Sequence, residues 1–301
     1  TPPRGIKITD VIINGAECEP YLTCDHRLMI ERTEEVLDAL RLIMRIVGAE
    51  GGHIGIESNK PEAIRLFEEA VGDDPSISVR PLRVKFPQGA EQQVISAIVG
   101  REVPSGGGLP SDVSCLVHNV ATALAILDAV RMRRPLIERP LTLSGDGIEN
   151  AGNFVERIGT NIQALLERQG LTEHHGTRED ANLLLLGGPM MGVAQAQFDV
   201  PVIKGTSGIL LLTPRGPVPP QRACIRCGRC VEHCPLGLMP GQLSIAAEGM
   251  NWDMAQRLGM IECKECGCCA YVCPAKRRIV HLIRFGKGEL AKRKRKQQQK
   301  A

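Results

Sequence analysis

The sequence predicts an α/β protein in its amino-terminal part, followed by a small mixed sheet and a helical domain built around two cysteine runs. Over residues 1–130, short apolar runs alternate with amphipathic helical patterns, which is typical of a mostly parallel sheet covered by helices. Shorter apolar runs bounded by Gly and Pro follow over residues 135–213. Cysteines then recur at one fixed spacing, twice, between residues 224 and 273.

The elements of the first region follow from periodicity and helix-start signals. We expect strands at 8–13, 53–57 and 79–85, and helices at 29–47, 61–71, 90–99 and 119–131. A polar loop at 14–20 follows the first strand. Ligands of such sheets bind beyond the carboxyl ends of the strands, so this loop is a candidate binding site, with a plain turn as the alternative. The glycine-rich segment 106–108 lacks the Lys-Ser/Thr continuation of a P-loop and is interpreted as a hinge.

The later regions differ in composition. Residues 135–213 fit a small mixed sheet of the β-grasp kind, with strands at 140–145, 182–186 and 209–212 and a helix at 161–169. A proline-rich linker follows, then the cysteine domain, and the basic end is interpreted as a solvated, disordered tail or as a segment attracted to an acidic membrane surface. The predicted boundaries are 1–134, 135–213, 214–221, 222–286 and 287–301.

Both cysteine runs have the spacing C-x2-C-x2-C-x3-C-P, which in bacterial ferredoxins holds four-iron clusters. The first run comprises Cys224, Cys227, Cys230 and Cys234, and the second comprises Cys263, Cys266, Cys269 and Cys273. In two-cluster ferredoxins the fourth cysteine of each run ligates the other cluster. We therefore assign one 4Fe–4S cluster to Cys224, Cys227, Cys230 and Cys273. The other 4Fe–4S cluster is assigned to Cys263, Cys266, Cys269 and Cys234.

Other interpretations of the cysteines are less favoured. Gly228 and Gly267 suit a cluster loop, since glycine tolerates positive φ angles. Structural zinc is usually held by two well-separated C-x2-C pairs, whereas here a third cysteine follows after two residues. A disulfide framework is unexpected in a long chain with no mark of secretion. Cys268 is interpreted as a neighbour of a ligand rather than as a ligand.

Composition limits the class of protein. A hydrophobic content of 43% is ample for packed cores. Aromatic residues make up 3% and the formal net charge is +3, which together count against nucleic-acid binding. Apolar runs are too short to span a bilayer and no signal-peptide pattern is present, so a protein of a reducing compartment is expected, at most peripheral to a membrane. Because the chain starts at Thr1, we expect it to lack an amino-terminal part.

Several motifs outside the cysteine runs resemble the flavin domain of the NADH-binding subunit of complex I. They are NGAECEP at 14–20, DHR at 25–27, PQGAEQ at 87–92, REVP at 101–104 and HNVAT at 118–122. With GGPM at 187–190 and the double cysteine run, nearly the whole chain resembles the C subunit of the Rnf electron-transport complex. The resemblance implies a Rossmann-like flavin domain for FMN and NADH, a β-grasp module for a soluble ligand, and a helical two-cluster ferredoxin domain.

The resemblance also implies the flavin-site residues. Asn14 and Glu17 would line the FMN crevice, and Glu91 would lie near the isoalloxazine and nicotinamide as the catalytic residue. Asn119 and Thr122 would hold the phosphate end, which agrees with their place at the start of a helix, where free N–H groups and the helix dipole favour an anion. The complex I pattern has an acidic residue at position 16, where this chain has alanine. The family's glycine-rich flavin loop is expected to precede residue 1, so this chain is expected to bind FMN poorly.

The function implied is that of an NADH-linked oxidoreductase subunit of a translocase complex. It would pass electrons between NADH and two 4Fe–4S clusters through FMN, converting two-electron into one-electron transfer, while partner subunits move ions. The implied partners are the other Rnf subunits and NADH/NAD, with ferredoxin a further candidate and no nucleic acid. The implied location is the cytoplasmic face of the bacterial inner membrane, as a peripheral subunit. The alternatives are a cobalamin reductase of the microcompartment type and a flavin-free iron–sulfur relay adaptor.

Overall fold

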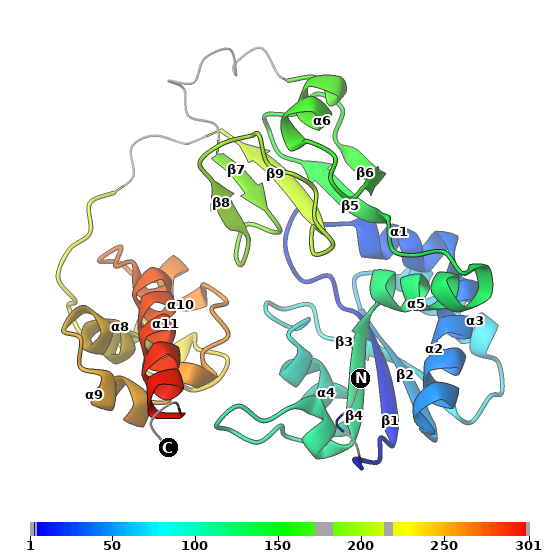
Figure 1. Cartoon of the computed structure of the whole chain (residues 1–301), viewed down its shortest axis with the longest axis horizontal. Coiled ribbons are helices and arrows are strands. Elements are labelled where there is room, and N and C mark those ends of the chain that lie inside the picture. The colour runs from blue at the N-terminus through cyan, green and yellow to red at the C-terminus, as the bar shows by residue number, and fades with distance from the viewer. Residues whose placement is uncertain (1–2, 4, 172–182, 214–218, 299–301) are drawn as a thin grey trace. The chain divides into compact units, whose positions relative to one another are not determined.

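The computed structural model describes residues 3, 5–171, 183–213 and 219–298 (Figure 1). The chain divides into two compact units. The first unit comprises residues 1–103 and 109–215, and the second comprises residues 104–108 and 216–301. Most of the predicted linker at 214–221, the first residue of the strand predicted at 182–186 and the last three residues of the basic tail lie outside the described residues.

The first unit contains a four-stranded, fully parallel sheet of order β3-β2-β1-β4. Its strands are β1 (Asp10–Gly15), β2 (Gly51–Glu57), β3 (Ile77–Leu82) and β4 (Cys115–Asn119). We did not predict β4, because the polar His118 and Asn119 shorten its apolar run. Strand order reverses between β1 and β4, and in open parallel sheets ligands bind beyond the carboxyl ends of the strands at such a switch point.

The helices of this unit connect consecutive strands. They are α1 (Cys24–Glu31), α2 (Thr33–Val47), α3 (Pro61–Val71), α4 (Glu91–Val99) and α5 (Val120–Met132), with the 3₁₀ helix η1 (Pro110–Val113) before β4. The single helix predicted at 29–47 is wrong, because the chain breaks at Arg32, whose φ is −130°. The Thr33 hydroxyl donates back to the Met29 carbonyl at 2.7 Å, a local bond that competes with a regular helix.

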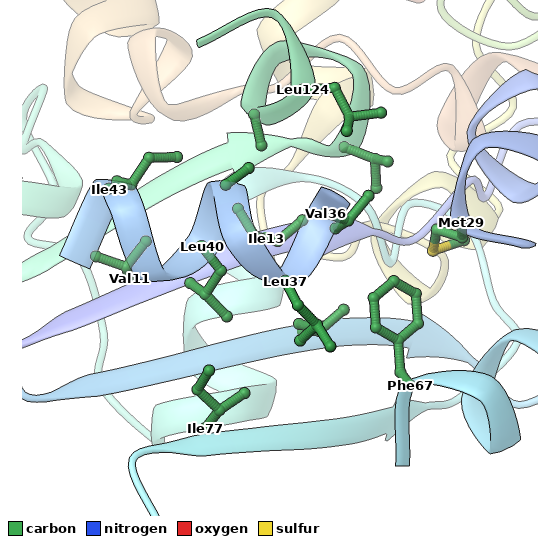
Figure 2. Packing of buried hydrophobic residues seen from close by; sticks show 14 of the residues in the cluster. Val11, Ile13, Met29, Val36, Leu37, Leu40, Ile43, Phe67, Ile77 and Leu124 are labelled. Atoms are coloured by element: carbon green, nitrogen blue, oxygen red, sulfur yellow. The ribbon is translucent and has the colours of Figure 1, made fainter. Parts of the chain in front are cut away.

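Two cores sandwich the parallel sheet. Helix α2 presents one buried stripe at helical spacing (Figure 2), made of Val36, Leu37, Leu40 and Ile43. This stripe packs in one core with Val11 and Ile13 of β1, while Ile12 packs with α4 on the opposite face. Alternate residues of β1 therefore serve opposite faces, as the two-residue period of a strand requires. The sheet is therefore covered on both sides. These packed layers hold the carboxyl ends of its strands in position.

A second, five-stranded sheet of order β6-β5-β9-β7-β8 completes the first unit. Its elements are β5 (Glu138–Ser144), β6 (Gly152–Arg157), α6 (Ile162–Gln169), β7 (Leu183–Leu186), β8 (Val193–Gln195) and β9 (Gly208–Leu212). The central β5–β9 pair is parallel and the other pairs are antiparallel. The predicted mixed sheet of the β-grasp kind is thereby confirmed. We missed β6 and β8, since β6 is largely exposed and β8 has three residues.

The second unit is helical. Its elements are α7 (Arg229–Glu232), α8 (Pro240–Glu248), α9 (Trp252–Arg257), η3 (Met260–Glu262), α10 (Cys268–Tyr271) and α11 (Ile279–Gln298). The core combines apolar residues of α8 and α11 with Cys269 and Cys273. The Trp252 and Phe285 rings meet edge-to-face at 5.7 Å. Among the described residues, no helix is long and apolar enough to cross a membrane.

The basic end of the chain differs from the disordered tail predicted at 287–301. Helix α11 continues to Gln298, through most of the segment predicted as a tail. Lys, Arg and Gln are good helix formers, and Lys292 pairs with Glu289 one turn earlier at 2.7 Å. The Arg293 guanidinium also lies over the Trp252 ring, 6.0 Å from its centroid. Local propensity and this one packed contact account for the extension.

Candidate cofactor sites

The eight cysteines of the two runs divide between two cavities of the second unit. One cavity is lined by Cys224, Cys227, Cys230 and Cys273. The other is lined by Cys234, Cys263, Cys266 and Cys269. Each cavity therefore combines three cysteines of one run with the fourth cysteine of the other. This grouping agrees with the ligand sets proposed from the sequence.

The backbone of the two runs repeats the same conformation. Arg226 and Gly228 have φ angles of 55° and 79°, and their counterparts Glu265 and Gly267 have 58° and 83°. Each run then enters a four-residue helix, α7 or α10. The positive φ of both glycines was anticipated, whereas that of Arg226 and Glu265 was not. A left-handed conformation is unfavourable outside glycine, so its repetition at matched positions indicates a loop shaped for a common ligand.

Zinc is the main alternative to iron–sulfur clusters. A structural zinc ion requires four donors within about 2.3 Å of one atom. Over the described ranges, no three Cys, His, Asp or Glu side chains are arranged to hold a single metal ion. The spacing favours clusters over zinc, because three cysteines at every third position with a fourth before a proline form the run of a four-iron cluster. The cavities measure about 200 and 20 Å³, so for the second the support comes from the donor set rather than from free space.

Burial sets the protonation of the cysteine thiols. Burial raises the pKa of Cys269 to about 12, reinforced by the nearby Cys263 and Cys266 thiols, and burial also raises the pKa of Cys263. A group of ionised thiolates is therefore unfavourable there without a positively charged centre among them. Iron supplies that charge when thiolates coordinate it.

The carboxyl edge of the parallel sheet holds a connected polar network. The Glu17 carboxylate accepts from the backbone N–H groups of Asp25 at 2.9 Å and His26 at 3.4 Å, at the start of α1. The Asn119 side-chain amide donates to the Asp25 carboxylate at 2.5 Å. The Asn119 side-chain oxygen accepts from Ala121 N–H at 3.0 Å and so caps α5. The network therefore joins the ends of β1 and β4 through α1.

Asn14 connects this edge to the loop that precedes α4. Its side-chain amide donates to the Gly89 carbonyl at 2.8 Å, and its side-chain oxygen accepts from Ala16 N–H at 3.1 Å. A Cβ at position 89 would lie 2.4 Å from the Ala16 carbonyl oxygen, so only glycine fits there. Glu91 is exposed at the first position of α4, two residues beyond this contact. The structure thus brings Asn14 and the Glu91 segment together.

The predicted flavin residues differ in their hydrogen bonds and in their burial. Asn14, Glu17 and Asn119 form hydrogen bonds within the protein that hold the edge loops, while Thr122 is half-buried on the first turn of α5. We did not single out Glu57, the last residue of β2, and Lys60 just beyond it, which form a buried ion pair of 3.2 Å. Their signal in the sequence is a charged residue at the end of a buried strand. Backbone N–H groups at the start of α5 suit a phosphate, so the edge is compatible with FMN.

Burial gives Glu17 an unusual titration. Burial, together with the neighbouring Asp25 charge, raises the pKa of Glu17 from 4.5 to about 7. The native state therefore binds this proton more tightly than the unfolded chain, and this contribution to stability is lost as pH rises from 4.5 to 7. We expect the wild-type unfolding free energy to fall across that window by up to about 3 kcal/mol. Glu17→Gln should lack this decline, which urea unfolding at about pH 5 and about pH 8 will measure. The same decline in both proteins would contradict the assignment.

The GGPM motif contacts the loop at 14–20. The Glu19 carboxylate accepts from the backbone N–H groups of Met190 at 2.9 Å and Met191 at 2.8 Å. A Cβ on Gly188 would lie 2.3 Å from the same carboxylate. The motif is therefore a turn whose free N–H groups bind Glu19, and it fastens the second sheet of the first unit to the edge loop.

Gly188→Ala is expected to displace the Glu19 carboxylate and to break both charge-assisted hydrogen bonds. The loss should amount to about 2–4 kcal/mol of unfolding free energy. Gly205 precedes β9 in the same sheet, and a Cβ added there would meet no atom within 4 Å. Gly205→Ala is therefore the matched control. Thermal unfolding measures both variants. Equal stabilities for the two would show that the Glu19 contact carries little free energy.

A Ser-His-Asp chain of hydrogen bonds lies elsewhere on the sheet. His53 bonds Ser78 through Nδ1 at 2.8 Å and Asp10 through Nε2 at 2.9 Å. These residues lie near the amino-terminal ends of their strands, away from the ligand edge. Asp10 is also paired with Arg101 at 2.8 Å; although burial would raise the pKa of Asp10, the bonds from His53 and other partners lower it. These Ser-His-Asp hydrogen bonds therefore link three neighbouring strands and have a structural role.

Comparison with family models defines the class of protein. Residues 1–128 match the model described as the Nuo51 FMN-binding domain, and residues 221–277 match the 4Fe-4S dicluster domain. The chain thus combines an FMN-binding domain with a domain for two 4Fe–4S clusters. That combination defines the class of iron–sulfur flavoproteins, and the predicted cofactors are confirmed at this level.

Curated relatives show what the chain is similar to over most of its length. The chain is 44% identical over 295 residues to the C subunit of the Na(+)-translocating ferredoxin:NAD(+) oxidoreductase complex of Acetobacterium woodii, covering 98% of this chain and 65% of that protein. It is 43% identical to the proton-translocating counterpart of Clostridium ljungdahlii, covering 96% and 62%. The C subunit of the ion-translocating oxidoreductase complex of Rhodobacter capsulatus is also 43% identical, covering 97% and 56%. Over nearly its whole length the chain is therefore similar to Rnf C subunits, in agreement with the resemblance that its motifs indicate.

The share of the relatives that the chain covers, and the solved structures that it resembles, limit what the similarity shows. The chain spans between about half and two thirds of the length of these relatives, as the shares of 56% to 65% state. Among solved structures, an NAD+-reducing [NiFe]-hydrogenase in the H2-reduced state aligns with a TM-score of 0.59 at 13% identity, covering 93% of this chain and 55% of that one. The air-oxidized state gives 0.56 at 13%, covering 83% and 48%. At this identity the likeness shows the fold alone.

Proposed function

We propose that the chain is the electron-transfer subunit of a membrane-bound complex, which passes electrons between NADH and two 4Fe–4S clusters through FMN. The observation that carries the proposal is the pair of cavities, each lined by four cysteines drawn from both runs. Their presence in one chain with an FMN-binding domain supports a flavin enzyme over a flavin-free relay adaptor. The names of the relatives support an oxidoreductase over a cobalamin reductase.

The proposed residue roles follow the two sites. Cys224, Cys227, Cys230 and Cys273 ligate one cluster, and Cys263, Cys266, Cys269 and Cys234 ligate the other. When bound, FMN supplies hydride acceptance from NADH and one-electron transfer to the clusters. Asn14, Glu17 and Asn119 shape the crevice by holding its loops, since their side chains bond those loops. Glu91 would lie near the flavin ring and nicotinamide, and Thr122 with the N–H groups of α5 would bind the phosphate.

Partners and location are proposed from the relatives. We assign to this chain the other subunits of an Rnf complex, NADH/NAD and ferredoxin as partners, because the relatives are C subunits of ferredoxin:NAD(+) oxidoreductase complexes. We assign a peripheral position on the cytoplasmic face of the bacterial inner membrane, with ion translocation performed by partner subunits. The exposed basic residues at 292–296 of α11 support contact with an anionic lipid surface.

An anaerobic titration tests the function. The chain is purified without oxygen, supplied with iron, sulfide and FMN, and titrated with NADH. Bleaching of the flavin absorbance followed by the electron paramagnetic resonance (EPR) signal of reduced clusters is the expected result. The same chain without FMN is the control, in which NADH leaves the clusters oxidised. Clusters that accept electrons from reduced ferredoxin but not from NADH with FMN bound would overturn the enzyme proposal in favour of a relay.

A further inference from the structure

The two cysteine cavities differ at a matched position four residues after the fourth cysteine of each run. Arg277 follows Cys273 by four residues and lines the cavity of Cys224, Cys227 and Cys230. The corresponding residue after Cys234 is Leu238, which lines the other cavity. Because the backbone of the two runs is otherwise repeated, this exchange of a cation for an apolar side chain makes the two sites unequal at that position.

The Arg277 side chain is buried, with 6% of it exposed. One terminal nitrogen donates to the half-exposed Glu248 carboxylate at 2.7 Å. Its Nε–H finds no hydrogen-bond partner among the residues that the structure describes. A buried charged donor without a partner is costly and rare in native proteins. A sulfur-rich cluster in the adjoining cavity supplies the acceptor that this group lacks.

Other charged residues line or flank both cavities. Arg226 lines the first cavity and is exposed, and its counterpart Glu265 lines the second. Glu265 is itself paired with Arg284 at 2.7 Å and Lys287 at 2.5 Å. The second cavity therefore has Lys264, Arg284 and Lys287 around one carboxylate, so net charge does not distinguish the two sites. The first cavity differs in having a buried guanidinium whose Nε–H has no partner among the described residues.

We propose that Arg277 sets the reduction potential of the cluster held by Cys224, Cys227, Cys230 and Cys273, by donating its Nε–H to a cluster sulfur. The inference rests on the ligand sets of the proposed function. A reduced cluster carries one more negative charge than an oxidised one, so a buried cation and a hydrogen bond stabilise the reduced form and raise the potential. The cluster beside Leu238 has an apolar side chain at the matched position, so this hydrogen bond is specific to the cluster beside Arg277.

Redox titration of the chain carrying both clusters, monitored by EPR, tests the inference. Arg277→Gln is expected to shift one of the two couples to a more negative potential and to leave the other nearly unchanged. Arg278→Gln is the matched control, since that side chain is exposed, and both couples should stay at their wild-type values. Arg277→Gln protein with two full clusters and two unshifted couples would overturn the inference.

A second variant keeps the inference testable if Arg277→Gln fails to assemble. Glu248→Gln removes the negative partner at the half-exposed end of the pair, so the same couple should shift to a more positive potential. Unshifted couples in Glu248→Gln would then overturn the inference. Wild-type protein that holds neither iron nor sulfide would refute the proposed function itself, so the two failures are distinguishable.

Discussion

Replacing Cys234 and Cys269 by serine together is expected to remove one cluster, whereas replacing Cys234 and Cys230 together removes both. The reason is cross-ligation: Cys234 lies in the cavity of the second run, although it belongs to the first run in sequence. The first double variant should therefore retain about four iron atoms per chain and the second close to none. Iron and sulfide analysis of anaerobically prepared protein makes the measurement.

Cys268→Ser is the control for these two double variants. Cys268 is adjacent to Cys269 but does not line either cysteine cavity, so its replacement should leave the iron content at the wild-type value. Loss of both clusters from the Cys234/Cys269 variant together with retention of one in the Cys234/Cys230 variant would mean that each run ligates its own cluster. That outcome would reverse the proposed sets.

Removal of iron from the wild-type chain is expected to unfold the second unit and to leave the first unit folded. Cys269 and Cys273 belong to the same core as Leu243 and Ile279. The loops between the cysteines contain the four-residue helices α7 and α10, which are too short to persist without tertiary contacts. Since metal binding is coupled to folding, the loss should exceed about 5 kcal/mol, comparable to the whole stability of a small domain.

The fluorescence of Trp252 reports on this prediction. It is the single tryptophan of the sequence and it packs in the core of the second unit against Phe285. After chelation of iron, its cooperative unfolding transition in urea should disappear, while circular dichroism should retain the transition of the first unit. An unchanged Trp252 transition in iron-free protein would show that the helical core is stable without clusters.

The cluster half of the chain was predictable because its signals are local. A cysteine spacing fixes which side chains meet, and the glycines at 228 and 267 adopt the positive φ that the loop requires. The exchange of the fourth cysteines follows from the ferredoxin pattern. No local pattern indicated that Arg277 would be buried beside one cavity, because its partner Glu248 lies 29 residues away. The length of α11 was missed because a basic composition was weighed above helix propensity.

The α/β half was predicted in class but not in every element. Apolar periodicity predicted the strands β1 to β3 and the helix α3. It did not predict the break at Arg32, because the apolar pattern continues on both sides of that residue. The role of Glu19 could not be read from its own loop, since its partners are 171 and 172 residues away. Motifs predicted which edge loops form the flavin site. They did not show that Asn14 and Asn119 bond the protein itself.

Quantification of iron and acid-labile sulfide per chain, in material purified anaerobically, tests the central claim most directly. Two cubane clusters predict about eight atoms of each, and a brown protein whose colour bleaches on reduction. Colourless protein, or protein with zinc in place of iron and no sulfide, would contradict the assignment of the two cysteine cavities and with it the proposed electron transfer.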